Sequence, residues 1–125
     1  MITTDLEQFV KAYIAAWSAT DREERKYLVE KVYNISAEFF ADEPGDHAVK
    51  HSGIGVILEN ITQVNKRLTV DNALTTECTG FSENHNIIRV AWQMKDKDDR
   101  IAMKGMNFLQ KDNSGRIEKD YIFIN

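Results

Sequence analysis

The chain contains little cysteine and little proline. Its 125 residues include one cysteine, Cys78, and one proline, Pro44. A lone cysteine cannot close an internal disulfide, so a secreted disulfide framework is excluded and a reducing compartment is favoured. With no second cysteine and no neighbouring base in the sequence, we expect Cys78 to be a small, buried hydrophobic residue. Pro44 and Gly45 indicate a loop over residues 42–52.

Long apolar runs and an excess of one charge are also missing. The apolar runs are far shorter than a bilayer span, so we expect no membrane segment. Acidic and basic residues are interleaved and the net charge is -4. Without a basic stripe to follow a phosphate backbone, we expect no nucleic-acid partner. Residues 1–7 hold two acids and no base, unlike a signal peptide, and a cytoplasmic protein is the simplest interpretation.

What remains is an ordinary globular composition, with 42% hydrophobic and 29% charged residues. The length predicts one domain over residues 1–125, which needs neither a metal nor a disulfide to fold. Near the N-terminus, Thr4 with Glu7 and Asp21 with Glu24 each fit the start of a helix. Apolar residues recur at helical spacing after both starts and again over residues 53–68, which predicts three helices. The first two stripes are Leu6, Phe9, Val10, Tyr13, Ile14 and Trp17, then Tyr27, Leu28, Val32 and Tyr33.

After Leu68 the apolar period changes from that of a helix to that of a strand. Alternation over residues 87–94 and 101–109 predicts strands with one buried face. Residues 112–115 predict a hairpin, and residues 117–124 a last strand. Residues 69–81 alternate less cleanly, and Gly80 indicates a bulge or bend. An earlier short strand is expected over residues 37–41. The predicted fold is therefore α+β and cone-shaped: helix, helix, strand and helix, followed by a four-stranded curved antiparallel sheet.

Four short stretches add a resemblance to this order of elements. They are Tyr13-Ile14 with Trp17 and Asp21, Glu43-Pro44-Gly45, Arg89 with Trp92, and Gly105-Met106-Asn107-Phe108 followed by Gly115-Arg116-Ile117. Together they resemble the nuclear-transport-factor-2-like superfamily, of cystatin-like fold, and within it the SnoaL-like polyketide cyclases and ketosteroid isomerases. The resemblance covers nearly the whole chain. It implies an apolar cavity inside the cone, a homodimer formed by the outer face of the sheet, and no cofactor.

The resemblance also implies roles for particular residues. In ketosteroid isomerases a carboxylate before a proline moves a proton on carbon, and a tyrosine and a protonated aspartic acid hold the enolate oxygen. By position, Glu43 looks like the base, and Tyr13 and Asn107 look like the two hydrogen-bond donors. Glu43 is longer than the usual aspartate, and the amide of Asn107 donates a hydrogen bond without titrating. The residues expected to line the ligand pocket are Trp17, Phe40, Trp92 and Met103.

Each candidate catalytic residue has a structural alternative. Tyr13 lies in an apolar stripe, as a core tyrosine with one hydrogen-bond partner does. Glu43 lies in a loop, where most carboxylates are solvated. Asn107 shares a strand face with Met103 and Leu109, where an apolar residue is expected. Its amide must therefore be hydrogen-bonded, either structurally to backbone or as a donor that faces a pocket.

A metal site has little support. His47 and His51 are four residues apart and near Glu43, but the Pro-Gly sequence favours an irregular loop and no third ligand is evident. We therefore expect no metal.

Two functions remain open. The first is a small-molecule binding domain with an apolar pocket, acting as an isomerase or cyclase on an apolar carbonyl or hydroxylated ring compound. The alternative is a non-catalytic pocket or dimerisation module in which the same residues complete a core. A deep cavity touching Tyr13 and Asn107 favours the first hypothesis, and a closed one favours the second.

Overall fold

A computed structural model of the chain describes residues 4–41 and 49–125. Two helices come first and are followed by a β-hairpin, a third helix and four long strands. The elements are α1 (Asp5–Ser18), α2 (Arg22–Val32), β1 (Tyr33–Ala41), β2 (Val49–Ser52), α3 (Ile54–Asn65), the π-helical segment η1 (Lys66–Asp71), β3 (Thr75–Asn84), β4 (Ile87–Lys95), β5 (Ile101–Lys111) and β6 (Ile117–Ile124).

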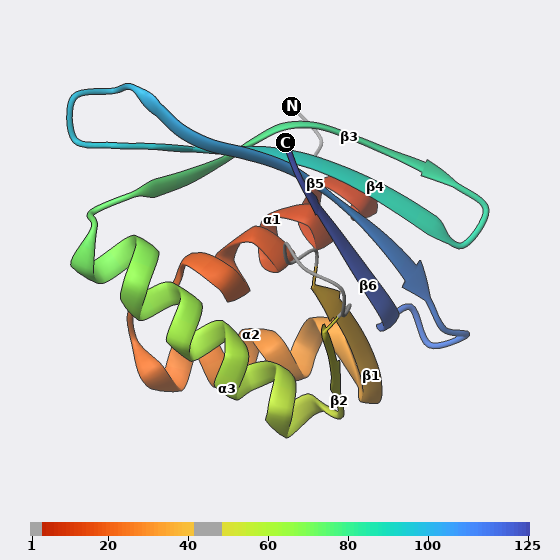
Figure 1. The fold of residues 1–125 in the computed structure, drawn as a ribbon. Coiled ribbons are helices and arrows are strands. Elements are labelled where there is room, and N and C mark those ends of the chain that lie inside the picture. Colours follow the sequence, from red (N-terminus) through yellow and green to blue (C-terminus); the bar gives the residue numbers. More distant parts are fainter. Residues whose placement is uncertain (1–3, 42–48) are drawn as a thin grey trace.

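All six strands belong to one sheet, in the order β2-β1-β6-β5-β4-β3. The pairs are antiparallel except β1 with β6, which are parallel. Figure 1 shows the sheet curving from β3, β4 and β5 above α1 down through β6 to β1 and β2, with the three helices on its inner side. The predicted α+β fold with a curved sheet is confirmed. The predicted strand count is too low, because β1 joins the same sheet and residues 49–52 of the expected loop form β2.

The two predicted helix starts are confirmed by their caps. Thr4 Oγ1 accepts a hydrogen bond from the backbone N–H of Glu7 at 3.0 Å, and Asp21 Oδ2 accepts one from that of Glu24 at 2.9 Å. These bonds satisfy backbone donors that have no partner within the helix. The second helix is one residue shorter than its apolar stripe, because Tyr33 begins β1.

A hydrogen-bonded cluster ties the three helices together at one end. The guanidinium of Arg25 donates to the Ala19 carbonyl, to Thr62 Oγ1 and to Asn65 Oδ1. Asn65 Nδ2 donates in turn to the carbonyls of Trp17 and Ala19. The cation thus lies at the C-terminal end of α1, where the helix dipole is negative. The cluster fixes the end of α3 against α1 and so positions the segment that follows α3.

The bulge predicted near Gly80 is present, but the prediction for Cys78 is wrong. The pairing of β3 with β4 shifts register between Cys78 and Gly80. Because β3 is an edge strand, the Cys78 side chain is exposed rather than buried, although Cys78 pairs with the inward-facing Trp92. The Sγ atom lies 3.5 Å from the Gly80 carbonyl oxygen.

The outer face of the sheet carries a row of aromatic side chains. Phe40 on β1 stacks on Tyr121 of β6 with ring centroids 4.6 Å apart, and Phe108 contacts Phe123 edge to face at 5.7 Å. Phe123 is 50% exposed and Ile87 is 37% exposed. Exposed apolar side chains gathered on one face are typical of a protein interface.

We therefore expect the chain to form a homodimer through this face. Sedimentation equilibrium at micromolar concentration should give a dimer for the wild type. Phe123→Lys should shift the protein to monomer, because it places a charge inside the interface. Tyr27→Lys, at a position on α2 that is 64% exposed, is the matched control and should stay dimeric. A wild type that sediments only as monomer would contradict the expectation.

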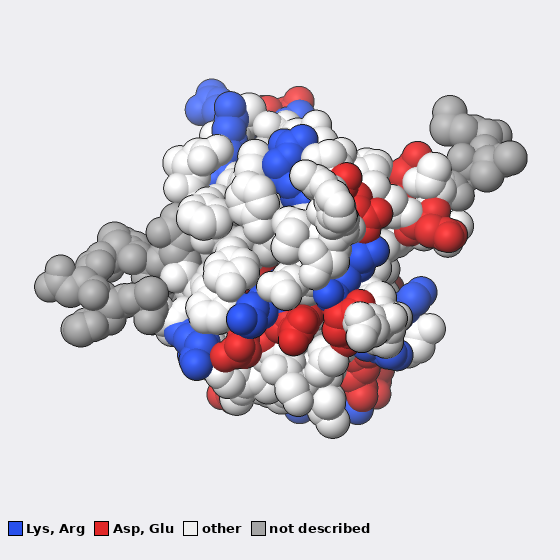
Figure 2. Space-filling model, turned by 90° about the vertical axis from the view of Figure 1, so that its right-hand side faces the viewer, with Lys and Arg blue, Asp and Glu red and all other residues white. Residues whose placement is uncertain are grey.

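No helix in the described ranges is long and apolar enough to cross a bilayer. Figure 2 shows one face of the molecule, on which acidic and basic side chains are interleaved and no broad basic area forms. That face therefore lacks the basic stripe that nucleic-acid binding requires.

Candidate functional site

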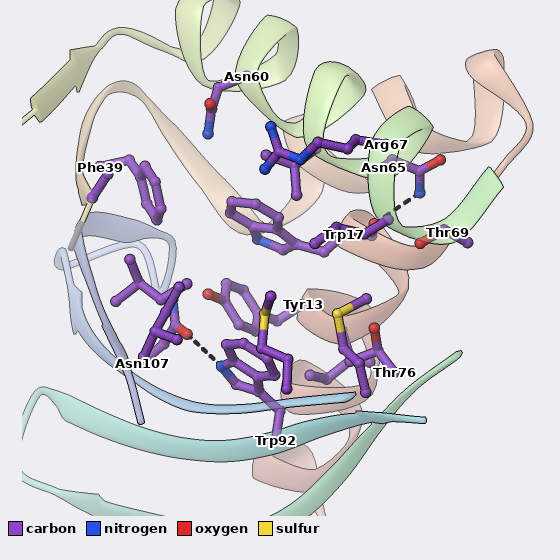
Figure 3. Close-up of a pocket in the computed structure, with 18 residues that line it drawn as sticks. Tyr13, Trp17, Phe39, Asn60, Asn65, Arg67, Thr69, Thr76, Trp92 and Asn107 are labelled. Carbon is purple, nitrogen blue, oxygen red and sulfur yellow. Dashed lines mark hydrogen bonds between the residues drawn. The ribbon is translucent and has the colours of Figure 1, made fainter. Parts of the chain in front are cut away.

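A cavity of about 460 Å³ lies between the helices and the inner face of the sheet. Its walls come from α1, β1, α3, η1 and the inner faces of β3 to β6 (Figure 3). Most of the side chains that line it are apolar or aromatic, with a few polar groups between them. They are Tyr13, Ile14, Trp17, Phe39, Ala41, Asn60, Val64, Asn65, Arg67, Leu68, Thr69, Thr76, Trp92, Met94, Met103, Asn107, Ile122 and Ile124.

A glycine makes room for the largest side chain on the sheet wall. Trp92 on β4 pairs with Gly105 on β5, and its indole lies against the Cα of that glycine. A Cβ at residue 105 would lie 2.7 Å from Cε2 and 2.8 Å from Cη2 of the indole, closer than real Cβ atoms approach. In this position Trp92 Nε1 donates a hydrogen bond of 2.8 Å to Asn107 Oδ1, two residues along the same face of β5. Gly105 therefore sets both the cavity wall and the orientation of Asn107.

Behind this wall the buried carboxylate of Asp120 accepts three hydrogen bonds. Asp120 Oδ2 accepts from the hydroxyls of Tyr13 at 2.9 Å and Tyr33 at 2.6 Å, and Oδ1 accepts from Asn107 Nδ2 at 2.7 Å. Asp120 is fully buried, and Tyr13, Tyr33 and Asn107 are 1–2% exposed. Because Trp92 donates to Asn107 Oδ1, the amide orientation of Asn107 is fixed from both sides.

Burial decides the electrostatics of this network. It raises the pKa of Asp120 to about 6, although the hydrogen bonds from Tyr33, Asn107 and Tyr13 act in the opposite direction. Burial also raises the pKa of Tyr13 and of Tyr33 well above the usual value, and the charge of Asp120 raises both further. At neutral pH the tyrosines therefore stay protonated, and most molecules carry an ionised Asp120. Trp17 Nε1 completes the network by donating to the Tyr33 hydroxyl oxygen at 3.1 Å.

The network determines which polar atoms remain for a ligand. The single hydroxyl hydrogen of Tyr13 is directed at Asp120, which leaves the lone pairs of the Tyr13 oxygen. Asn107 has two amide hydrogens, and Asp120 accepts one of them. The cavity can therefore offer an N–H donor at Asn107 on β5 and an acceptor at Tyr13 on α1. Of the two expected hydrogen-bond donors, Tyr13 and Asn107, only Asn107 can donate to a ligand while Asp120 is ionised.

The structure brings together most of the residues expected at a pocket. Tyr13, Trp17, Trp92, Met103 and Asn107 all line the cavity. The expected bond of the Asn107 amide to backbone is not found among the described residues: its partners there are the side chains of Asp120 and Trp92. Asn107 also lines the cavity, so its role as a donor to a ligand stays a prediction.

Phe40 is the wrong choice on β1. The alternation of the strand turns Phe39 inward to the cavity and Phe40 outward onto Tyr121. Glu43 and His47 lie outside the described residues. Among residues 4–41 and 49–125, no group of three or more His, Cys, Asp or Glu side chains could hold a metal ion.

Sequence reasoning missed Asp120 and Tyr33. The register of β5 with β6 shifts between Gln110 and Lys111, so Ile117 and Asp120 both face inward although they are three residues apart. Counting back in steps of two from Ile122, a cavity residue, would have placed Asp120 on the inner face. The sequence pattern assigns Tyr33 to the helical stripe of α2, and only its place in β1 brings its hydroxyl to Asp120.

The helical wall carries a second set of polar groups that the sequence did not single out. Asn60 on α3 and Arg67 on η1 line the cavity on the side away from Asn107 and Trp92 (Figure 3). Thr69 lines it as well, although at about 100° per residue an α-helix would place it opposite Asn60. The helix is wound as a π-helix over residues 66–71, and Arg67, Leu68 and Thr69 all face the cavity there. π-Helical turns are frequent at functional sites.

Comparison with known proteins shows similarity in fold. No protein-family model matches the chain, and no curated protein sequence matches it. Among solved structures, a proposed isomerase of the SnoaL-like family from Agrobacterium tumefaciens is similar with a TM-score of 0.79 and 19% identity, over 94% of this chain and 95% of that one.

A SnoaL-like protein of unknown function from Burkholderia thailandensis has a TM-score of 0.74 at 13% identity, over 99% of both chains. A proposed polyketide cyclase from Sinorhizobium meliloti has a TM-score of 0.68 at 18% identity, over 95% of this chain and 96% of that one. The chain thus has the fold of the SnoaL-like and nuclear-transport-factor-2-like proteins, as the resemblance implied.

Proposed function

We propose that this chain binds a small, largely apolar ring compound whose carbonyl or hydroxyl oxygen lies against Asn107 and Tyr13. The cavity of about 460 Å³ carries this proposal. Ligand pockets typically measure about 300–1,000 Å³ and combine apolar walls with a few fixed polar groups. A carbonyl oxygen would accept from the free N–H of Asn107, and a hydroxyl could also donate to the Tyr13 oxygen.

Rigid placement of the polar groups supports binding rather than mere core packing. A core amide satisfied by Asp120 and Trp92 has no need of an adjoining cavity. Here the same amide forms part of the cavity wall, and four aromatic residues surround the space: Tyr13, Trp17, Phe39 and Trp92. Side chains held in place by a buried network lose little entropy when a ligand binds, which favours affinity.

Matched ligands test the proposal. Tetralone and tetralin have the same ring skeleton and differ in the carbonyl oxygen. We expect isothermal titration to show about tenfold tighter binding of tetralone, the effect of one hydrogen bond that replaces an unsatisfied polar group. Val64→Trp, which fills the cavity, should abolish binding of both compounds. Val56→Trp, at an exposed position of the same helix, should leave both unchanged. Binding that survives Val64→Trp would contradict the proposed site.

A second candidate is a cofactor-independent isomerase or cyclase. It is favoured by Asp120, whose pKa of about 6 places a titrating group one hydrogen bond behind Tyr13. The hydroxyl proton of a ligand could pass to the Tyr13 oxygen while the proton of Tyr13 passes to Asp120. The resulting oxyanion would accept a hydrogen bond from Asn107.

Carbon chemistry would also need a base at the cavity, and no Asp or Glu of the described residues lines it. Glu43 is the candidate that the resemblance implies. Faster deuterium uptake by tetralone in heavy water with the wild type than with Glu43→Gln would support catalysis. Equal deuterium uptake with and without the wild-type protein would contradict catalysis and favour a non-catalytic binding pocket.

A further inference from the structure

We propose that the ligand of this cavity carries a carboxylate, which binds to Arg67 and Asn60 on the helical wall. This inference rests on the proposed function, because it specifies the ligand of the same cavity. The ligand would then be an apolar ring acid with an oxygen near Asn107 on the sheet wall and a carboxylate on the opposite side.

The charge of the wall is the first argument. Arg67 is the one charged side chain among the described residues that line the cavity. Its guanidinium forms no ion pair with a described acidic side chain, and Asp71, the acid of the same segment, pairs with Lys66 at 3.1 Å. The cavity wall is therefore positive at this point and attracts an anion rather than a cation.

Asn60 provides an independent observation. It lies between Ile57 and Ile61, which are fully buried, and Val64, which lines the cavity. An apolar residue would be expected at this position of the helix face. No hydrogen bond joins the Asn60 amide to the other described residues, and Figure 3 shows the amide turned into the cavity. A polar group in that position is explained by a partner that is not part of the chain.

Helix geometry places the two groups together. Asn60 and Arg67 are seven residues apart, so α-helical winding puts them on the same face about two turns apart. Figure 3 shows both on the helical side of the cavity, with the guanidinium and the amide directed toward the space above Tyr13. The planar guanidinium can donate two parallel hydrogen bonds to a carboxylate, and the Asn60 amide can donate a third.

A carboxylate fits this wall better than a phosphate. One arginine balances one negative charge, and the remaining wall is largely apolar. A second negative charge would lose hydration without gaining a partner, which is costly in apolar surroundings. Arg67 is also exposed, so the carboxylate can stay in contact with water at the cavity edge.

The test uses a hydroxynaphthoate with its hydroxyl and carboxylate at opposite ends of the rings, and the corresponding hydroxynaphthamide. The two differ in charge and little in shape. Titration calorimetry on the wild type should show the carboxylate binding about tenfold tighter or more, as expected for hydrogen bonds to a charged group. Arg67→Met should remove this preference and leave binding of the amide within about twofold. Asn60→Leu should reduce the preference by a smaller factor.

Arg22→Met is the matched control, because it removes an exposed arginine on α2 that does not line the cavity. It should keep the preference, and all variants should keep the wild-type melting temperature without ligand. Equal binding of the two compounds to the wild type, or a preference that survives Arg67→Met, would contradict a ligand carboxylate bound to Arg67. Neither result would contradict the proposed function. If neither compound nor tetralone binds the wild type, both proposals fail.

Discussion

Asn107→Asp is expected to lower the free energy of unfolding at pH 7 by about 3 kcal/mol. The change replaces an N–H donor, 2.7 Å from Asp120 Oδ1, with a second carboxyl oxygen. Two carboxyl groups this close cannot both ionise, so the folded protein must hold an extra proton. An unfolded carboxyl has a pKa of about 3.9, so keeping that proton at pH 7 costs about 4 kcal/mol. A hydrogen bond between the carboxyls regains about 1 kcal/mol.

The pH dependence identifies this cause. In the wild type, burial raises the pKa of Asp120 from 3.8 to about 6. Its contribution to stability is therefore complete below about pH 4, decreases as the pH rises through 6, and is constant above about pH 7. In Asn107→Asp the pair keeps a proton beyond pH 7, so stability should keep decreasing by about 1.4 kcal/mol per pH unit. Urea unfolding between about pH 6.5 and 8 measures the two slopes, and parallel profiles would contradict the expectation.

The charge-swapped double variant, Asn107→Asp with Asp120→Asn, is the control. The amide introduced at position 120 would present its oxygen where Oδ2 now accepts from Tyr13 and Tyr33, and its N–H₂ where Oδ1 now faces residue 107. The carboxylate introduced at position 107 would accept from that amide and from Trp92 Nε1. Every hydrogen bond of the network is then restored with one carboxylate, so the double variant should be more stable than Asn107→Asp alone. Additive losses would show that the network does not couple these residues.

Gly105→Ala should destabilise the protein by about 2–4 kcal/mol and abolish ligand binding. The added methyl group overlaps the indole of Trp92, and overpacking of this kind typically costs about 1–3 kcal/mol. The indole must move, and the hydrogen bond from Trp92 Nε1 to Asn107 is then lost, at about 1 kcal/mol more. Because Trp92 lines the cavity, the shape of the cavity changes as well. Urea unfolding and titration with tetralone measure the two effects.

Two further variants separate overlap from a general effect of alanine in a strand. Gly80→Ala on β3 is the matched control, because a Cβ there has no atom within 4 Å. It should change stability by less than about 0.5 kcal/mol, as is usual at open surface positions. In a Trp92→Leu background, where the indole is gone, Gly105→Ala should cost much less than in the wild type. An equal cost in both backgrounds would refute steric overlap as the cause.

The sequence alone determined the three helices and the inward faces of β4 and β5. Thr4 and Asp21 mark helix starts through local hydrogen bonds, and alternation over residues 87–94 identifies the inward face of β4. Signals of this kind depend on neighbours within a few residues, so they can be recognised in the sequence without knowledge of the fold. The same local patterns placed Tyr13, Trp92 and Asn107 on faces that turned out to line one cavity.

Only the tertiary structure decided how the site is assembled. Asp120 bonds to Tyr13 across 107 residues and to Tyr33 across 87, and neither pairing leaves a periodic signal. The β5–β6 register shift lets Ile117 and Asp120 both face inward, and the parallel pairing of β1 with β6 joins the two strands that carry Tyr33 and Asp120. The opposing wall depends on the π-helical winding after Asn65, which brings Thr69 to the cavity beside Arg67. Charge and hydrogen-bond partners in a buried site depend on such long-range contacts, which local periodicity does not record.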